Sequence, residues 1–228
     1  MSSTKPAAKQ KAAAPVVAVE PPSREERFLN WFKANQTPVL AGAAVLATIV
    51  LLTWGFSVAS ARKEAAAQAR LEAAWNAQDA GNLPLAASEF QAVVDGFGGT
   101  NAAMEAVIAV NQARLLNGQS QLAVDALREF LATNPSIGFK ASAGRLLGAA
   151  LENVGKPVEA AAAYEAAAGD ATEAFRKAEA LVAAGRAYRA AGNTDAAIRV
   201  LRQVITDYPE TASFPAAEIR LGELTRGS

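Results

Sequence analysis

The side chains available for catalysis in this 228-residue chain are limited, because it contains neither cysteine nor histidine. Thiolate nucleophiles, imidazole bases and nearly all zinc, haem and copper sites need one of these two residue types. The carboxylates that remain show no spacing that singles out a pair for acid/base work. We therefore expect a protein that is not an enzyme and that holds no metal or cofactor.

Two further binding chemistries are unfavourable on sequence grounds. The glycine-rich run D-G-F-G-G-T-N, Asp95 to Asn101, lacks the Lys-Ser or Lys-Thr pair of a phosphate-binding loop and is expected to connect two helices. Formal net charge is zero, and residues 62–228 carry sixteen Lys and Arg against nineteen Asp and Glu. A slightly acidic body lacks the basic surface that nucleic acids require, so we expect no nucleic-acid partner.

The residues best placed to bind a partner would project from one face of successive amphipathic helices. They are Leu71, Trp75, Gln78, Ile108, Gln112, Leu115, Arg145, Glu152, Arg186 and Arg189. This groove would be apolar at the end nearer the membrane segment and basic at its far end. It would suit an extended or helical peptide, with apolar contacts giving affinity and arginine binding carboxylates. The alternative is that these are only the exposed side chains of a scaffold.

The elements that would position these residues form an internal repeat with an interval of 37 residues. Its most regular member is a glycine, which occurs at Gly81, Gly118, Gly155 and Gly192. An alanine follows five residues after each glycine, and a large apolar residue follows four residues later. A helical segment with a small residue near its centre, such as Gly185, precedes the turn. Asn111 at the equivalent position predicts a looser or polar contact in the second repeat.

The repeating unit is therefore a helix, a glycine turn, a second helix and a break, with Pro135 and Pro209 placed to stop the chain. The unit resembles the tetratricopeptide repeat, through Leu181, Gly185, Tyr188, Gly192, Ala197, Leu201, Val204 and Pro209. The resemblance implies an all-α solenoid over residues 61–228, with four helix pairs and a C-terminal capping helix at 214–224.

Residues 38–60 form an apolar run inside a charge-free stretch of twenty-eight residues, which is long enough for a transmembrane helix. Residues 23–37 precede it and are expected to form a juxtamembrane amphipathic helix, with Ser23 and Glu26 at capping-box spacing. Residues 1–22 are expected to be a disordered tail. A cleaved signal peptide is the competing interpretation, because Ala59-Ser60-Ala61 matches a cleavage pattern before Arg62, but the run is longer than signal peptides use.

The Lys and Arg residues of the tail favour an N-terminus inside the cell. Residues 1–37 carry six Lys and Arg, whereas only Arg62, Lys63 and Arg70 lie soon after the run. This predicts a single-pass protein of the bacterial inner membrane, with a cytoplasmic N-terminus, a span in the lipid bilayer and a periplasmic C-terminal domain.

The whole arrangement resembles the family of single-pass inner-membrane proteins that includes the ancillary subunit of the bacterial Sec translocon. Trp31, Phe32, Asn35, Trp54 and Gly55 carry this resemblance. It implies a periplasmic scaffold for protein–protein interaction, with translocon subunits and periplasmic chaperones as partners. A second interpretation is a cell-envelope scaffold for outer-membrane assembly or cell division, because residues 201–222 are similar to repeats of such proteins.

Overall fold

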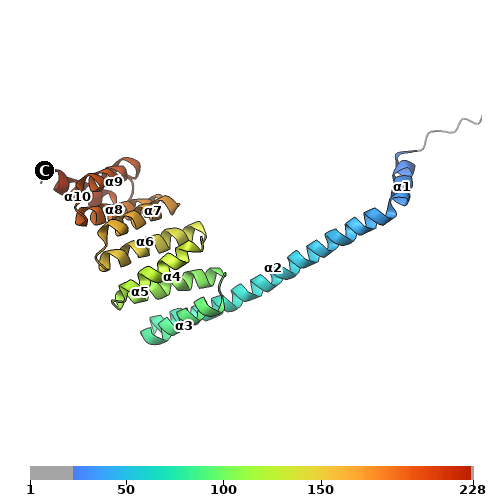
Figure 1. The fold of residues 1–228 in the computed structure, drawn as a ribbon, viewed down its shortest axis with the longest axis horizontal. Coiled ribbons are helices and arrows are strands. Elements are labelled where there is room, and N and C mark those ends of the chain that lie inside the picture. Colours follow the sequence, from blue (N-terminus) through green and yellow to red (C-terminus); the bar gives the residue numbers. More distant parts are fainter. Residues whose placement is uncertain (1–22, 227–228) are drawn as a thin grey trace, which may run out of the picture. The chain divides into compact units, whose positions relative to one another are not determined.

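A computed structural model of the protein describes residues 23–226, and every regular element in that range is an α-helix. The predicted tail, residues 1–22, lies outside the described residues. The chain divides into two compact units, Met1–Phe56 and Ser57–Ser228. The ten helices of the described range are shown in Figure 1: α1 (Arg24–Ala34), α2 (Gln36–Asp79), α3 (Leu83–Gly96), α4 (Asn101–Leu116), α5 (Ser120–Ala132), α6 (Ile137–Asn153), α7 (Pro157–Asp170), α8 (Ala174–Ala190), α9 (Thr194–Asp207) and α10 (Phe214–Arg226).

The first unit contains α1 and the N-terminal part of α2. The capping box opens α1: Ser23 Oγ accepts the Glu26 N–H at 3.2 Å, and the Ser23 N–H donates to Glu26 Oε2 at 2.9 Å. This arrangement satisfies two backbone donors at the helix N-terminus. The helix ends at Ala34 and is capped by Asn35, whose Nδ2 donates to the Trp31 carbonyl at 2.8 Å. Because α2 begins at Gln36, a single residue separates the two helices.

Within the described residues, α2 is the one helix long and apolar enough to cross a membrane. The side chains of its apolar stretch are exposed rather than packed against protein. The hydroxyls of Thr48 and Thr53 donate to the Ala44 and Ile49 carbonyls, both at 2.9 Å. These two polar groups are therefore satisfied within the helix, as a hydrocarbon environment requires. No break separates the apolar stretch from the part of α2 that enters the first repeat.

Each of the four helix pairs turns at a glycine with left-handed backbone conformation. The four φ values lie between 72° and 77°, at Gly81, Gly118, Gly155 and Gly192. In the fourth pair, the Gly192 N–H donates to the Arg189 carbonyl at 3.0 Å and the Asn193 N–H donates to the Tyr188 carbonyl at 2.9 Å. This is a Schellman motif, in which a side chain at the glycine position would be strained. The turn expected from the 37-residue interval is confirmed.

A second set of glycines lets the helices of a pair approach closely. A Cβ atom on Gly185 would lie 2.9 Å from Leu201 Cγ, and one on Gly148 would lie 2.6 Å from a ring carbon of Tyr164. Both separations are well below van der Waals contact, so a larger residue would force the neighbouring helix or side chain to move. The close approach expected at this position is confirmed in the third and fourth pairs.

Within the second unit, the C-terminal part of α2 contacts the connection between α3 and α4. The Glu64 carboxylate accepts hydrogen bonds from the N–H groups of Asn101 and Ala102 at 2.8 and 3.0 Å. These two groups are in the first turn of α4, where backbone donors have no acceptor within the helix. Lys63 Nζ donates to the Gly98 carbonyl at 2.7 Å. The glycine-rich run is therefore a connection between α3 and α4, as expected, and α2 holds it in place.

The last helix of the described residues, α10, has polar side chains at positions where α8 has apolar ones. Glu218 and Thr225 of α10 stand where α8 presents Leu181 and Tyr188, which pack against the core. Gly222 keeps the small position, and a Cβ there would meet the Arg226 guanidinium at 3.2 Å rather than a helix. Ala217 on the opposite face is fully buried. The predicted four helix pairs with a C-terminal capping helix are confirmed.

Enlarging Gly148 should destabilise the repeat domain. In Gly148→Ala the new methyl group meets the buried Tyr164 ring, which we expect to lower the free energy of unfolding by about 1–3 kcal/mol. The matched control is Gly169→Ala in α7, where a Cβ meets nothing within 4 Å and helix propensity favours alanine by up to about 1 kcal/mol. Urea unfolding of the detergent-solubilised protein, followed by circular dichroism, measures both. Equal stabilities for the two variants would contradict this packing.

Candidate peptide-binding surface

The ten candidate residues lie on the first helices of the four pairs. The helix α2 carries Leu71, Trp75 and Gln78; α4 carries Ile108, Gln112 and Leu115; α6 carries Arg145 and Glu152; and α8 carries Arg186 and Arg189. Their exposure differs along the row. Leu71 is buried in the core, and Ile108 and Leu115 are half-buried against it. These three residues therefore support the surface more than they form it.

Trp75, Gln78 and Gln112 come together at an apolar pocket between the first two repeats. The pocket has a volume of about 180 Å³, and no charged side chain lines it. Trp75 packs edge-on against Phe90, with ring centroids 4.7 Å apart. An apolar lining with a few amide groups is the composition that ligand sites share, and this pocket is smaller than the roughly 300–1,000 Å³ of most small-molecule sites.

Two lining residues of this pocket, Leu83 and Leu116, were not among the sequence candidates. Their exposed fractions are 57% and 83%, which is high for leucine. Leu116 is the last residue of α4 and Leu83 the first of α3, so both lie beside glycine turns rather than on the inward helix face. A large apolar residue adjoining a turn was the only indication available in the sequence.

At the other end of the row, the expected basic surface is neutralised by ion pairs between repeats. Arg186 donates to both oxygens of Glu152, at 3.1 and 2.7 Å, and Arg189 donates to Glu223 at 2.7 Å. In both pairs the partners are 34 residues apart and belong to adjacent repeats. The side chains that were expected to attract carboxylates from a partner thus already bind carboxylates of this chain. The basic end inferred from Arg186 and Arg189 is corrected to a balanced row of charges.

Glu152 is held ionised by its neighbours. Burial raises the pKa of its carboxyl. The hydrogen bonds from Arg186 and from the Tyr164 hydroxyl, the latter at 2.7 Å, and the charge of Arg186 together lower this pKa by more than burial raises it, so the pKa lies below the usual value. Burial and the adjoining carboxylate raise the pKa of Tyr164, which therefore stays a donor.

A second group of the same composition links the third and fourth repeats through α7, α8 and α9. Glu165 of α7 accepts the Tyr188 hydroxyl at 2.6 Å and Arg199 NH2 at 2.6 Å. The hydrogen bond to Glu165 raises the pKa of Tyr188, so this hydroxyl also remains protonated. Two Tyr–Glu–Arg groups therefore hold these repeats together.

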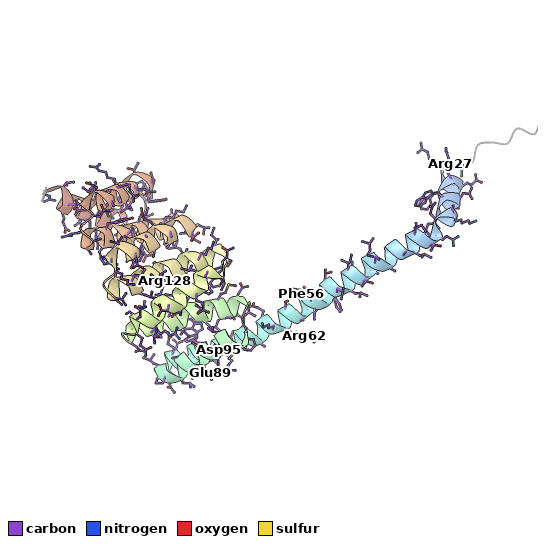
Figure 2. The ribbon with its side chains drawn as sticks, in the orientation of Figure 1. Arg27, Phe56, Arg62, Glu89, Asp95 and Arg128 are labelled. Atoms are coloured by element: carbon purple, nitrogen blue, oxygen red, sulfur yellow. The ribbon has the colours of Figure 1, made fainter. Side chains whose placement is uncertain are left out.

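The second repeat is packed differently, as Asn111 predicted. This side chain is 1% exposed, and its Nδ2 donates to the Val107 carbonyl at 2.8 Å while its Oδ1 accepts Arg114 NH1 at 3.0 Å. A hollow of about 400 Å³ lies beside it and is lined by residues of α3, α4 and α5, among them Asp95, which is labelled in Figure 2. The buried apolar residues likewise form two clusters, one in α2 to α4 and one in α5 to α10. The polar contact expected in this repeat is confirmed.

Arg145 is separate from both ends of the row. It lines a hollow of about 290 Å³ with Phe175 and Arg176, and within the described residues it makes no ion pair. The structure thus divides the candidates into an uncharged pocket, an isolated arginine and a neutralised row of charges.

Comparison with known proteins identifies the repeats. A family model described as a tetratricopeptide repeat-like domain matches residues 55–178, which is more than half of the chain, and a tetratricopeptide repeat model matches residues 179–211. No curated protein sequence matches the chain.

Three solved structures illustrate the likeness in fold. A crystal structure of MamA protein is 20% identical, with a TM-score of 0.58, and the match covers 71% of this chain and 81% of that one. The repeats of a Podosopora anserina putative kinesin light chain are 21% identical, with a TM-score of 0.57 and coverage of 70% and 85%. A tetratricopeptide repeat protein from Parabacteroides merdae is 14% identical, with a TM-score of 0.57 and coverage of 71% and 60%.

Removing the charge of Glu152 should weaken the domain in a pH-dependent way. We expect Glu152→Gln to lower the free energy of unfolding by about 1 kcal/mol at neutral pH, since Arg186 loses its partner. The lowered folded pKa means that the carboxylate stabilises the fold fully above the unfolded pKa of about 4.3 and loses this contribution as the pH falls through the folded value. The difference between wild type and variant should therefore vanish in acid.

Urea unfolding at neutral pH and near pH 3 measures this difference, with Glu105→Gln as the control. Glu105 is an exposed carboxylate of α4, and its replacement should change stability by less than about 0.5 kcal/mol at either pH. A Glu152→Gln effect of the same size in acid and at neutral pH would contradict the ion pair.

Proposed function

Since the chain belongs to the tetratricopeptide repeat-like domain family, we propose that it is a membrane-anchored scaffold that binds polypeptide partners on the surface formed by its first helices. In this proposal residues 38–60 span the membrane, residues 23–37 are a juxtamembrane amphipathic helix and residues 61–228 are the binding domain. Tetratricopeptide folds are typically non-catalytic scaffolds, and such repeats present extended binding surfaces.

The observation that carries the proposal is the uncharged apolar pocket of the first two repeats. Leu83 and Leu116 expose most of their surface beside it, although burial in the core is usual for leucine. The amide groups of Gln78, Gln112 and Asn117 can hydrogen-bond the main chain of a bound segment. The partner that fits is an uncharged, apolar segment of an extended polypeptide.

The compartment proposed for the repeat domain is the bacterial periplasm. The Lys and Arg residues before the span support this orientation, because cytoplasmic flanks are enriched in positive charge and long C-terminal domains are exported largely regardless of their own charge. Lys63 and Glu64 already make hydrogen bonds to the loop between α3 and α4, so the first repeat follows the proposed span closely in sequence.

The proposed partners are subunits of the Sec translocon, periplasmic chaperones and the polypeptides that leave the channel. Support comes from the sequence resemblance through W-F-K-A-N and T-W-G on either side of the apolar run. An uncharged apolar pocket is also suited to exported chains, which expose apolar segments before they fold.

A photo-crosslinking amino acid at Gln112 should capture a translocon subunit or an exported chain in living cells. The same amino acid at Arg202, exposed on α9, is the positional control and should give little of this product. Leu116→Glu should reduce the Gln112 product at least about tenfold, because it places a charge at the pocket, whereas Leu122→Glu on α5, also exposed, should not.

Mass spectrometry of the crosslinked products identifies the partner. Products made with outer-membrane assembly or cell-division proteins, and none with the translocon, would replace the secretion role with an envelope scaffold. Products that are equal at Gln112 and Arg202 would overturn the pocket as the binding site.

The orientation predicts that a phosphatase active only outside the cytoplasm is active when fused after Ser228. The full-length protein should also remain with membranes after an alkaline carbonate wash, because its apolar stretch is long enough to span. An inactive fusion would place the repeats in the cytoplasm. A mature protein that begins at Arg62 would show that the apolar stretch is a cleaved signal.

A further inference from the structure

The helix α1 presents an aromatic face that is not packed against protein. Phe28 and Trp31 are 62% and 53% exposed, and Phe32 also lies on this face. The Phe28 ring stacks on both others, with centroid distances of 6.3 Å to Trp31 and 6.4 Å to Phe32. Three adjoining exposed aromatic rings on a helix of eleven residues are a large apolar surface, and such a surface marks an interaction site.

The charges of α1 are divided along the helix. Glu25 and Glu26 lie in the first turn, where the helix dipole favours negative charge, and Glu26 is also held by the capping box. Arg27, labelled in Figure 2, lies next to Trp31 at one edge of the aromatic face when the sequence is placed at 100° per residue, whereas Lys33 lies on the opposite side of the helix. One cation therefore adjoins the aromatic face, and the other lies on the polar side, which faces the headgroups when a helix lies in the membrane interface.

The chain itself indicates what covers this face. Only Asn35 separates α1 from α2, the helix long enough to cross the bilayer, so in the proposed arrangement α1 must lie at the membrane boundary. Aromatic rings and long cationic side chains are the groups favoured there, because the rings enter the acyl boundary while the charges reach the headgroups. The preceding tail adds Lys5, Lys9 and Lys11 in sequence.

We propose that α1 is a binding surface for anionic phospholipid, with Phe28, Trp31 and Phe32 inserted at the acyl boundary and Arg27 and Lys33 paired with negatively charged headgroups. The proposal rests on the membrane span of the proposed function and adds a lipid class to it. Arginine and lysine near a negatively charged leaflet each strengthen its attraction for the helix. Interfacial binding would also hold the cytoplasmic end of the span at a fixed depth.

The three tryptophans, Trp31, Trp54 and Trp75, allow α1 and the span to be tested separately. One full-length variant keeps Trp31 alone, through Trp54→Phe and Trp75→Phe, and a second keeps Trp54 alone. Both are reconstituted in vesicles of phosphatidylcholine with or without phosphatidylglycerol. Lipids brominated at different acyl depths quench tryptophan inside the bilayer, and aqueous iodide quenches tryptophan in water.

With phosphatidylglycerol present, Trp31 should be quenched most by lipid brominated close to the headgroup and should be protected from iodide. Arg27→Glu with Lys33→Glu should lower the lipid quenching of Trp31 at least about twofold and leave Trp54 unchanged. The matched control is Arg62→Glu with Lys63→Glu, which changes the same number of charges on the other side of the apolar run and should leave Trp31 unchanged.

Each other outcome overturns part of the argument. Quenching of Trp54 by lipid together with iodide access to Trp31 would refute the lipid surface and leave the span intact. Absence of lipid quenching at Trp54 would refute the span, and the lipid surface with it. Protection of Trp31 that is equal in both lipid mixtures would show that neutral lipid is enough, and protection that persists in detergent would show that a second copy of the chain covers α1; either result refutes a surface for anionic lipid.

Discussion

The left-handed glycine turn is the constraint on which the repeat domain depends. Each first helix ends at a glycine with φ near +75°, and two hydrogen bonds close it in the same way in all four pairs. This backbone conformation reverses the chain over very few residues, so the second helix must return along the first. Each pair then has apolar faces that it cannot bury alone, and stacking the pairs produces the continuous solenoid.

The repeats share this turn and differ in a few side chains of their helices. Gly148 and Gly185 let the third and fourth pairs close tightly, and the two Tyr–Glu–Arg groups add links between these repeats. In the second pair, the buried Asn111 makes a polar contact at the position where the third and fourth pairs have glycine and the first pair has Ala74. The apolar pocket adjoins this less uniformly packed part, which is where adjustment to a partner costs the least packing energy.

The N-terminal unit differs from the repeat domain in that its apolar side chains are not buried by protein. In α2 the apolar side chains are exposed, and threonine hydroxyls donate to backbone carbonyls of the same helix. Exposed apolar side chains are unfavourable in water, whereas both features are favourable in hydrocarbon. In α1 a capping box and an aromatic face combine in a helix too short to be stable alone in water. Both features suit a lipid environment, and they are the observations on which the proposed span and the proposed lipid surface depend.

The amino-acid sequence by itself determined the helix pairs, their glycine turns, the capping helix and the apolar segment. These features are local, because a left-handed turn requires glycine at one position and a membrane helix requires a continuous apolar run. Only the tertiary structure decided that Leu71 is buried, that Arg186 and Arg189 are paired with Glu152 and Glu223, and that Leu83 and Leu116 meet at one pocket. Those contacts join residues of neighbouring helices and repeats. They depend on the angle and separation between packed helices, which no local sequence pattern contains.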